Sequence, residues 1–264
     1  MNERIESAAK NARLNILRLA NQANKGGNGT HIGPSLSVVE VLTALFFGVL
    51  RPQDAFILSK GHAGLAYYAV LKEAGLLTEE QLDSFETNGS GFLAHPSKNI
   101  HNGIICSSGS LGMGLSYACG LALAAKKQGK DKNIYVLLGD GELNEGSNWE
   151  AAMFAAHQKL DNLVAVVDYN GMQLDGFSAD ILAVDVAAMW KAAGWQTAAC
   201  DGHSLSALRE ELDVSPAAAP QAVLAKTVKG KGVSFMENNS AWHHSRLSDK
   251  QYEEAAKEVG RVGI

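Results

Sequence analysis

The chain contains 264 residues, 46% of them hydrophobic and 19% charged, with a formal net charge of −5. This composition is typical of a globular protein with a substantial buried core, and we expect a single domain over residues 1–264. Because no run of Lys or Arg exceeds two residues and the apolar stretches are short, the composition argues against binding to nucleic acid and against a membrane span.

The first third of the sequence predicts helices and one short strand. Small and apolar residues recur at helical spacing over Ile5–Ala23, and the glycine-rich sequence GGNG that follows should end this helix. A second helix is expected over Leu36–Leu50, and Ala55–Leu58 is expected to form a short buried strand. Thr78, with Gln81 three residues later, predicts a capping box at the start of another helix.

The middle of the chain predicts a parallel sheet. Two apolar segments that lack alternation, Asn133–Leu138 and Leu163–Val167, should be strands, and Trp149–Leu160 between them should be a helix. A strand, a crossover helix and a second strand form a parallel unit that is buried on both faces. The later elements expected are strands at Trp195–Ala199 and Ala222–Ala225, a helix at His203–Leu212, a loop at Ser215–Pro220 and a helix within Leu247–Ile264. We therefore predict an α/β fold, in which helices sandwich a parallel sheet and ligands bind beyond the carboxyl ends of its strands.

Oxygen-bearing side chains follow the two central predicted strands. Asp140 stands in the sequence GDG directly after the first strand, and Asn170 follows the second strand, 30 positions later. If these strands are neighbours, the Asp140 carboxylate, the Asn170 amide oxygen and a backbone carbonyl of the next turn open into one crevice, which suits Mg²⁺ with room for phosphate oxygens. The glycines beside Asp140 and a helix starting near Gly146 would favour a diphosphate there. Each motif alone is a common turn, but the pair on adjacent strands is much more specific.

The segment Gly139–Gln173, GDGELNEGSNWEAAMFAAHQKLDNLVAVVDYNGMQ, resembles the thiamine diphosphate signature of the transketolase family. The resemblance runs from about Asn11 to His243 and is collinear with the amino-terminal, diphosphate-binding domain of transketolase. In extent the chain is similar to the separately encoded N-terminal subunits of split bacterial transketolases. The resemblance therefore implies a thiamine diphosphate-binding fold and an enzyme that transfers a two-carbon ketol unit from a ketose to an aldose.

The resemblance also implies a role for each matching residue. Asp140, Asn170 and the backbone carbonyl of Met172 would ligate Mg²⁺, or Ca²⁺ or Mn²⁺ in its place, which bridges the two phosphates of the cofactor. Glu145 would belong to a network of acidic residues that links paired active sites. The other residues that would contact thiamine diphosphate are Lys60, His62, Gly109, Leu111, Gly141, Lys229 and His243.

Three loop histidines, His31, His95 and His243, would stand over the thiazolium ring and the substrate as catalytic residues. The cofactor supplies carbanion chemistry, and the protein must move protons onto and off alkoxides near neutral pH, which imidazole does well. The family usually has Gly after the histidine matched by His243, whereas this chain has His244. A shift of the loop by one residue would put His244 in the place of His243.

Two departures from the family lie on the substrate side. Ser97 follows His95-Pro96 where the sugar-phosphate transketolases commonly have Glu, and Pro34 stands where some members have a Ser near the cofactor. Both changes are compatible with a donor or acceptor other than the usual pentose and hexose phosphates. The sequence leaves the identity of the sugar open.

A transketolase active site lies between two domains, of which one holds the diphosphate and the other holds the aminopyrimidine ring and supplies a glutamate. Only Leu247–Ile264 follow the His243 region, so we expect the second domain on a C-terminal transketolase subunit. Two copies of each chain would form an α2β2 heterotetramer with cofactor sites at its interfaces. The three cysteines, which form no CxxC pair, favour a reduced, cytoplasmic compartment.

Two other functions remain open. A deoxyxylulose-synthase-like or other thiamine enzyme subunit would start from a 2-oxo acid. The set of His31, His95 and His243 favours a ketol donor instead, because releasing CO₂ from an oxo acid requires less recognition of hydroxyl groups. A non-catalytic thiamine-binding module should have lost Asp140, Asn170 or these histidines, and all are present.

Overall fold

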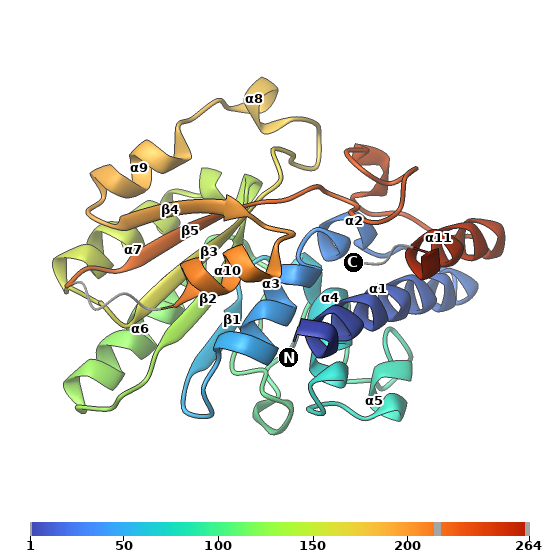
Figure 1. Ribbon diagram of the computed structural model, residues 1–264, viewed down its shortest axis with the longest axis horizontal. Helices are drawn as coiled ribbons and strands as arrows, with labels where there is room; N and C mark the ends of the chain where they lie inside the picture. Colours follow the sequence, from blue (N-terminus) through green and yellow to red (C-terminus); the bar gives the residue numbers. More distant parts are fainter. Residues whose placement is uncertain (1, 214–217, 262–264) are drawn as a thin grey trace. The chain divides into compact units, whose positions relative to one another are not determined.

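The strands of the chain form one five-stranded parallel sheet (Figure 1). The computed structural model describes residues 2–213 and 218–261, which fall into two compact units. One unit contains residues up to 48, 61–107 and 227 onward, and the other contains residues 49–60 and 108–226. The sheet belongs to the second unit. Its strands, in spatial order, are β1 (Ala55–Leu58), β2 (Ile134–Gly139), β3 (Leu163–Tyr169), β5 (Gln221–Lys226) and β4 (Gln196–Asp201).

The burial of the strands follows their position in this order. Every residue of β1 and β2 is buried, and so is all of β3 except its last residue, which explains why these segments are apolar without alternation. Strand β4 lies at the edge of the sheet and is partly exposed. All neighbouring strands pair in parallel, so the predicted α/β fold with a parallel sheet is confirmed.

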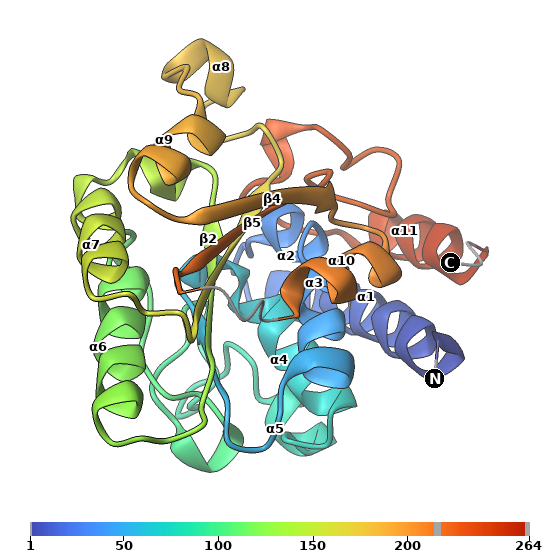
Figure 2. The same cartoon turned by 60° about the vertical axis from the view of Figure 1, so that its left-hand side comes forward.

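Helices of the second unit cover both faces of the sheet. Figure 2 shows α6 and α7 on one face and α10 on the other. Helix α6 packs on β2 and β3 through apolar residues such as Leu115 and Ala122, while α10 packs on β4 and β5. The chain moves in one direction across the sheet from β1 through β2 to β3, and in the opposite direction from β4 to β5. Because both crossovers are right-handed, their helices lie on opposite faces of the sheet. The helices of this unit are α6 (Gly114–Lys127), α7 (Gly146–His157), α8 (Ser178–Ile181), α9 (Val186–Ala192) and α10 (Leu205–Leu212).

The first unit is helical and is organised around its longest helix, α1, which packs on α3, α4 and α11. Residues such as Ala9, Ile16 and Ala20 form the buried face of α1, and the predicted helix is confirmed. The capping box of Thr78 and Gln81 is also confirmed, at the start of α5. The helices of this unit are α1 (Asn2–Lys25), α2 (Ile32–Leu36), α3 (Val39–Ala44), α4 (Gly64–Glu73), α5 (Glu79–Asp83) and α11 (Asp249–Arg261).

The prediction of one continuous helix over Leu36–Leu50 is wrong. The chain forms α2, then α3, and then a single π-helical turn over Leu45–Val49. The break comes between α2 and α3, where the Ser37 hydroxyl donates to the Pro34 carbonyl (3.0 Å) and Val38 leaves the helical region with φ −107° and ψ 9°. A side-chain hydroxyl that bonds to a nearby carbonyl competes with the backbone hydrogen bonds of a helix.

The same stretch, Ile32–Val49, is long and apolar enough by length and composition to cross a membrane, with a mean hydropathy of 1.8. However, 78% of it is buried inside the protein. Core helices of water-soluble proteins pass the same test, so the stretch is weak evidence for a membrane span.

Several predicted boundaries differ from those observed by one to three residues. Helix α7 begins at Gly146 instead of Trp149, because its first turn follows directly from the turn after β2. It ends at His157 instead of Leu160, and Lys159 turns the chain with a positive φ of 51°. Part of the predicted loop at Ser215–Pro220 lies outside the described residues.

Candidate functional site

The carboxyl ends of β2 and β3 form one side of the predicted crevice. The strands are neighbours, and their register pairs Gly139 with Asp168, so Asp140 and Asn170 both lie just beyond this pair. The Asp140 side chain is largely buried, at 6% exposure, and its carboxylate accepts a hydrogen bond from the Gly171 N–H. The structure therefore brings the turns after the two strands together, as their sequences predict.

The Asn170 amide is oriented by its neighbours. Its Nδ2 donates to the carboxylate of Asp168 (2.9 Å), and its Oδ1 accepts from the backbone N–H of Met172 (3.0 Å). Asp168 is fully buried and also forms an ion pair with the buried ammonium group of Lys60. A carboxylate only accepts hydrogen bonds, so the amide atom of Asn170 that contacts Asp168 is the nitrogen. The amide oxygen of Asn170 therefore faces the turn that contains Met172.

Burial and charge both act on Asp140. Burial, and then the negative charge of Asp168, raise the pKa of the Asp140 carboxyl from 3.8 to about 7, although the N–H of Gly171 and the charge of Lys60 oppose this rise. A divalent cation beside the carboxylate would supply the missing positive charge. No three His, Cys, Asp or Glu side chains gather to hold a metal within residues 2–213 and 218–261. A cation here would therefore need amide, carbonyl and phosphate oxygens besides Asp140, and these oxygen types fit Mg²⁺ or Ca²⁺.

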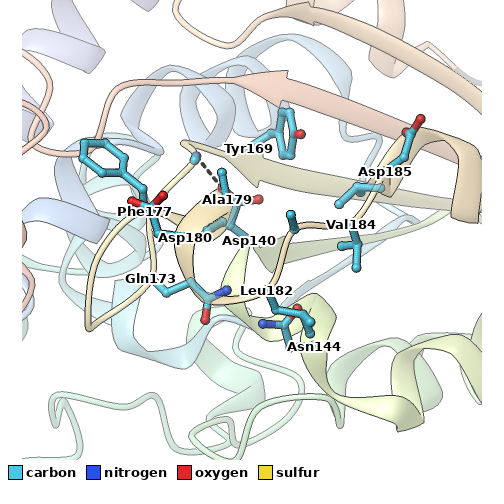
Figure 3. A pocket seen from close by; sticks show the side chains of 14 residues that line it. Asp140, Asn144, Tyr169, Gln173, Phe177, Ala179, Asp180, Leu182, Val184 and Asp185 are labelled. Atoms are coloured by element: carbon cyan, nitrogen blue, oxygen red, sulfur yellow. Dashed lines mark hydrogen bonds between the residues drawn. The ribbon is translucent and has the colours of Figure 1, made fainter.

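A cavity of about 610 Å³ lies beside Asp140 in the second unit. Figure 3 shows Asp140, Gln173 and Tyr169 among the side chains that surround it. A Cβ atom on Gly141 would lie 3.1 Å from Cγ of Gln173, so a larger residue at position 141 would crowd the Gln173 side chain. The cavity is lined by Asp140, Asn144, Tyr169, Gly171, Gln173 and residues 177–180 and 182–186.

A second buried carboxylate, that of Glu142, joins three chain segments of this unit. It accepts hydrogen bonds from the Ser59 hydroxyl and from the backbone N–H groups of Gly112 and Gly139, the latter two at 3.0 Å. Burial nevertheless raises the pKa of Glu142 above its ordinary value. Glycine is required at position 114, because a Cβ atom there would lie 2.3 Å from Oγ of Ser59. Glu142 thus fixes the glycine-rich segment 109–114 against the turn that carries Asp140.

Five histidines gather in the first unit. The ring of His31 is central, with ring centroids 5.6 Å from His62, 5.5 Å from His95, 5.5 Å from His243 and 4.6 Å from His244. The rings of His62 and His243 are stacked, with an interplanar angle of 25°. Five imidazoles in one cluster can hold hydroxyl groups and transfer protons near neutral pH.

His243 has a further partner, because Nζ of the buried Lys229 lies 2.8 Å from its Nδ1. This contact fixes the orientation of the His243 ring. His244 has an exposed side chain, whereas His243 is half-buried.

Comparison with known proteins identifies the family. The sequence matches the family described as transketolase, thiamine diphosphate binding domain, over residues 7–262. The chain belongs to the transketolase family. The predictions of this family, of its fold and of an enzyme chain are therefore confirmed.

Relatives within the transketolase family include separate subunits of similar length. The chain is 41% identical to a subunit of the apulose-4-phosphate transketolase of Actinobacillus succinogenes, over 97% of this chain and 96% of that protein. It is 37% identical to the 6-deoxy-6-sulfo-D-fructose transketolase subunit SqwG of a Clostridium species, over 94% and 95%. The match to human transketolase, at 36% identity, covers 93% of this chain and 41% of the human protein. The transketolase structure from Campylobacter jejuni has a TM-score of 0.87 at 27% identity, covering 98% of this chain and 43% of that one. The chain thus spans less than half the length of these single-chain transketolases.

The residues expected from the transketolase resemblance are divided between the two units. The first unit contains the expected histidines and Lys229, and the second contains the metal ligands, Lys60, Gly109, Leu111 and Glu145. Glu145 is exposed at the start of α7. Lys60 was expected beside the diphosphate, and its ammonium group contacts Asp168.

Asp168 and Glu142 were not among the expected site residues. Both are buried charges beside the ends of apolar strands, which is the signal that could have found them.

Proposed function

We propose that this chain is the thiamine diphosphate-binding subunit of a cytoplasmic, two-chain transketolase, which transfers a two-carbon ketol unit from a ketose to an aldose. The proposal depends on one observation: the chain matches 96% of the length of a protein that is itself named as one subunit of a transketolase. The chain also retains Asp140, Asn170 and the loop histidines. A C-terminal-half transketolase subunit would complete the active site in an α2β2 heterotetramer. In this assembly the whole chain, residues 1–264, acts as one thiamine diphosphate-binding domain.

The second unit supplies the anchor for the cofactor in this proposal. The Asp140 carboxylate, the Asn170 amide oxygen and the Met172 carbonyl would hold Mg²⁺, and the metal would hold the diphosphate. The high pKa of Asp140 supports this assignment, because a desolvated carboxylate without a counter-charge is the ligand that a cation stabilises most. Asp168 would keep the Asn170 oxygen directed at the metal through the 2.9 Å hydrogen bond to its amide nitrogen.

Further residues of the chain would contact the cofactor. The backbone of Gly141 would approach the diphosphate, and Glu142 would hold the glycine-rich segment for the ring and linker. Bound thiamine diphosphate supplies the nucleophilic carbon to which a two-carbon unit is transferred. The remaining expected contacts are Lys60, His62, Gly109, Leu111, Lys229 and His243.

The histidine cluster would recognise and deprotonate the sugar. His31, His95 and His243 would hold hydroxyl and carbonyl oxygens of the substrate and take or return protons at their ring nitrogens. Lys229 supports this role for His243, since its contact with Nδ1 fixes the orientation of the ring. Glu145, which is exposed at the start of α7, would take part in the acidic network at the interface with other subunits.

The proposal is tested by reconstitution with a C-terminal transketolase subunit, thiamine diphosphate and Mg²⁺. Hydroxypyruvate, which carries a ketol group, and pyruvate, which does not, are offered as donors with glycolaldehyde as acceptor. We expect ketol transfer from hydroxypyruvate only, and only when both chains are present. Turnover of pyruvate alone would favour the 2-oxo-acid enzyme, and a complex that binds the cofactor without turning over either donor would point to a non-catalytic module.

A further inference from the structure

His244 lies directly opposite His31 on a neighbouring stretch of chain. Thr30 and Ser245 form an isolated antiparallel bridge, in which each backbone N–H donates to the other residue's carbonyl, at 2.9 and 3.0 Å. In an antiparallel register, the pair next to Thr30 and Ser245 is His31 and His244. Side chains of such directly opposed residues contact each other, which explains why these two rings lie 4.6 Å apart in an edge-on arrangement.

The ring of His244 packs against the backbone of Gly29. A Cβ atom on Gly29 would lie 2.8 Å from Cε1 and 3.3 Å from Nδ1 of His244, so the ring rests against the backbone of Gly29. The next residue but one, Arg246, donates from Nη2 to the Gly27 carbonyl (2.6 Å) and anchors the same stretch. Although His244 is exposed, its ring therefore lies between Gly29 and the ring of His31.

The five histidines of the cluster differ in their exposure to solvent. His31, His62 and His243 are half-buried, whereas His95 and His244 are exposed. Among the ring neighbours of the half-buried His31, His95 and His244 are therefore the two that solvent reaches most readily. Of these two, His244 is the one whose ring contacts His31 more closely, at 4.6 Å against 5.5 Å.

We propose that His244 is a specificity-determining residue, which limits the length of the aldose acceptor that can reach His31. A ring 4.6 Å from the His31 imidazole narrows the approach to it, and short aldehydes should pass this ring more easily than long ones. This inference rests on the proposed function, because it assigns His244 to the substrate side of a ketol transferase. The position after His243 is also where this chain departs from the glycine usual in the transketolase family.

The test uses the reconstituted two-chain enzyme with hydroxypyruvate as donor and glycolaldehyde, glyceraldehyde, erythrose and ribose as acceptors. The measured quantity is kcat/KM for ribose divided by kcat/KM for glycolaldehyde. We expect this ratio to rise about fivefold to tenfold in His244→Gly and in His244→Ala, because removing the ring enlarges the approach. It should stay within about twofold of wild type in His244→Phe, which keeps a ring of similar size, and in His101→Ala, which alters an exposed histidine outside the cluster.

A second readout needs neither the partner nor the cofactor. In NMR spectra of the full chain alone, the imidazole signals of His31 should shift in His244→Gly and stay in place in His101→Ala, because the edge-on ring is lost only in the first. Two variants, Gly and Ala, guard against a folding defect in either one. A ratio within about twofold of wild type in both variants, or the same rise in His244→Phe, overturns the proposal. If the wild-type complex transfers to no aldose at all, the proposed function fails instead, and this inference falls with it.

Discussion

Replacing Asp140 with Asn should stabilise the chain in the absence of a metal ion. The Asp140 carboxylate is buried beside the charge of Asp168, and both effects raise its pKa from 3.8 to about 7. An Asn side chain can still accept the hydrogen bond from the Gly171 N–H, but it carries no charge. The substitution therefore removes a cost of the folded state, although it also removes the only negatively charged side chain among the proposed metal ligands.

The size and the sign of the change in the free energy of unfolding follow from the pKa shift of Asp140. A rise in pKa from 3.8 to about 7 corresponds to about 4 kcal/mol, at about 1.4 kcal/mol per pKa unit. Because the pKa of Asp140 is raised in the folded state, ionising this carboxyl costs wild type no stability below pH 3.8. The cost grows as the pH rises toward 7 and is complete above pH 7. We expect Asp140→Asn to gain up to about 4 kcal/mol over wild type at pH 8, or roughly 10 °C in Tm. At about pH 5, most of this gain should be absent.

Thermal and urea unfolding in a chelating buffer at pH 5 and pH 8 would measure the effect. Asp175→Asn, which removes one exposed negative charge from the same unit, is the matched control for net charge. Added Mg²⁺ with an excess of thiamine diphosphate should raise the Tm of wild type more than that of Asp140→Asn. An Asp140→Asn variant that is no more stable at pH 8, or is more stable by the same amount at both pH values, would refute this account of Asp140.

Three further substitutions test other contacts. Glu142→Ala leaves three buried donors without their acceptor and should cost about 3 kcal/mol or more in urea unfolding; a loss below about 1 kcal/mol would contradict its joining role. Asp168→Asn leaves the Lys60 ammonium buried without its counter-ion and removes the group that orients Asn170. It should cost about 3 kcal/mol and weaken Mg²⁺-dependent cofactor binding, and calorimetry showing unchanged affinity would argue against the orienting role. His243→Ala should lower kcat more than cofactor affinity in the two-chain enzyme, by roughly 100-fold, and equal effects on both would leave its proton-transfer role unsupported.

The sequence predicts the strands and their ends well because the signals are local. Apolar segments without alternation mark β2 and β3, and GDG and the following Asn stand directly at their carboxyl ends. Hydrophobic periodicity does not register the break between α2 and α3, because Val38 leaves the helical region inside a largely apolar segment.

The supporting residues of the site could not be predicted in the same way. Besides near neighbours, Glu142 contacts Gly112, 30 residues away in sequence, and Asp168 contacts Lys60, 108 residues away, and only the fold brings these partners near. His244 was expected only as a possible replacement for His243. The structure places both in the cluster, because the bridge between Thr30 and Ser245 puts His244 opposite His31.

The most direct test of the central claim is the affinity for thiamine diphosphate, measured by calorimetry on this chain alone and on its complex with a C-terminal transketolase subunit. Each sample is titrated with Mg²⁺ present and with a chelator. The account predicts tight binding only when both chains and Mg²⁺ are present, and loss of that binding in Asp140→Ala. Tight binding by this chain alone in chelator, or unchanged binding in Asp140→Ala, would contradict it.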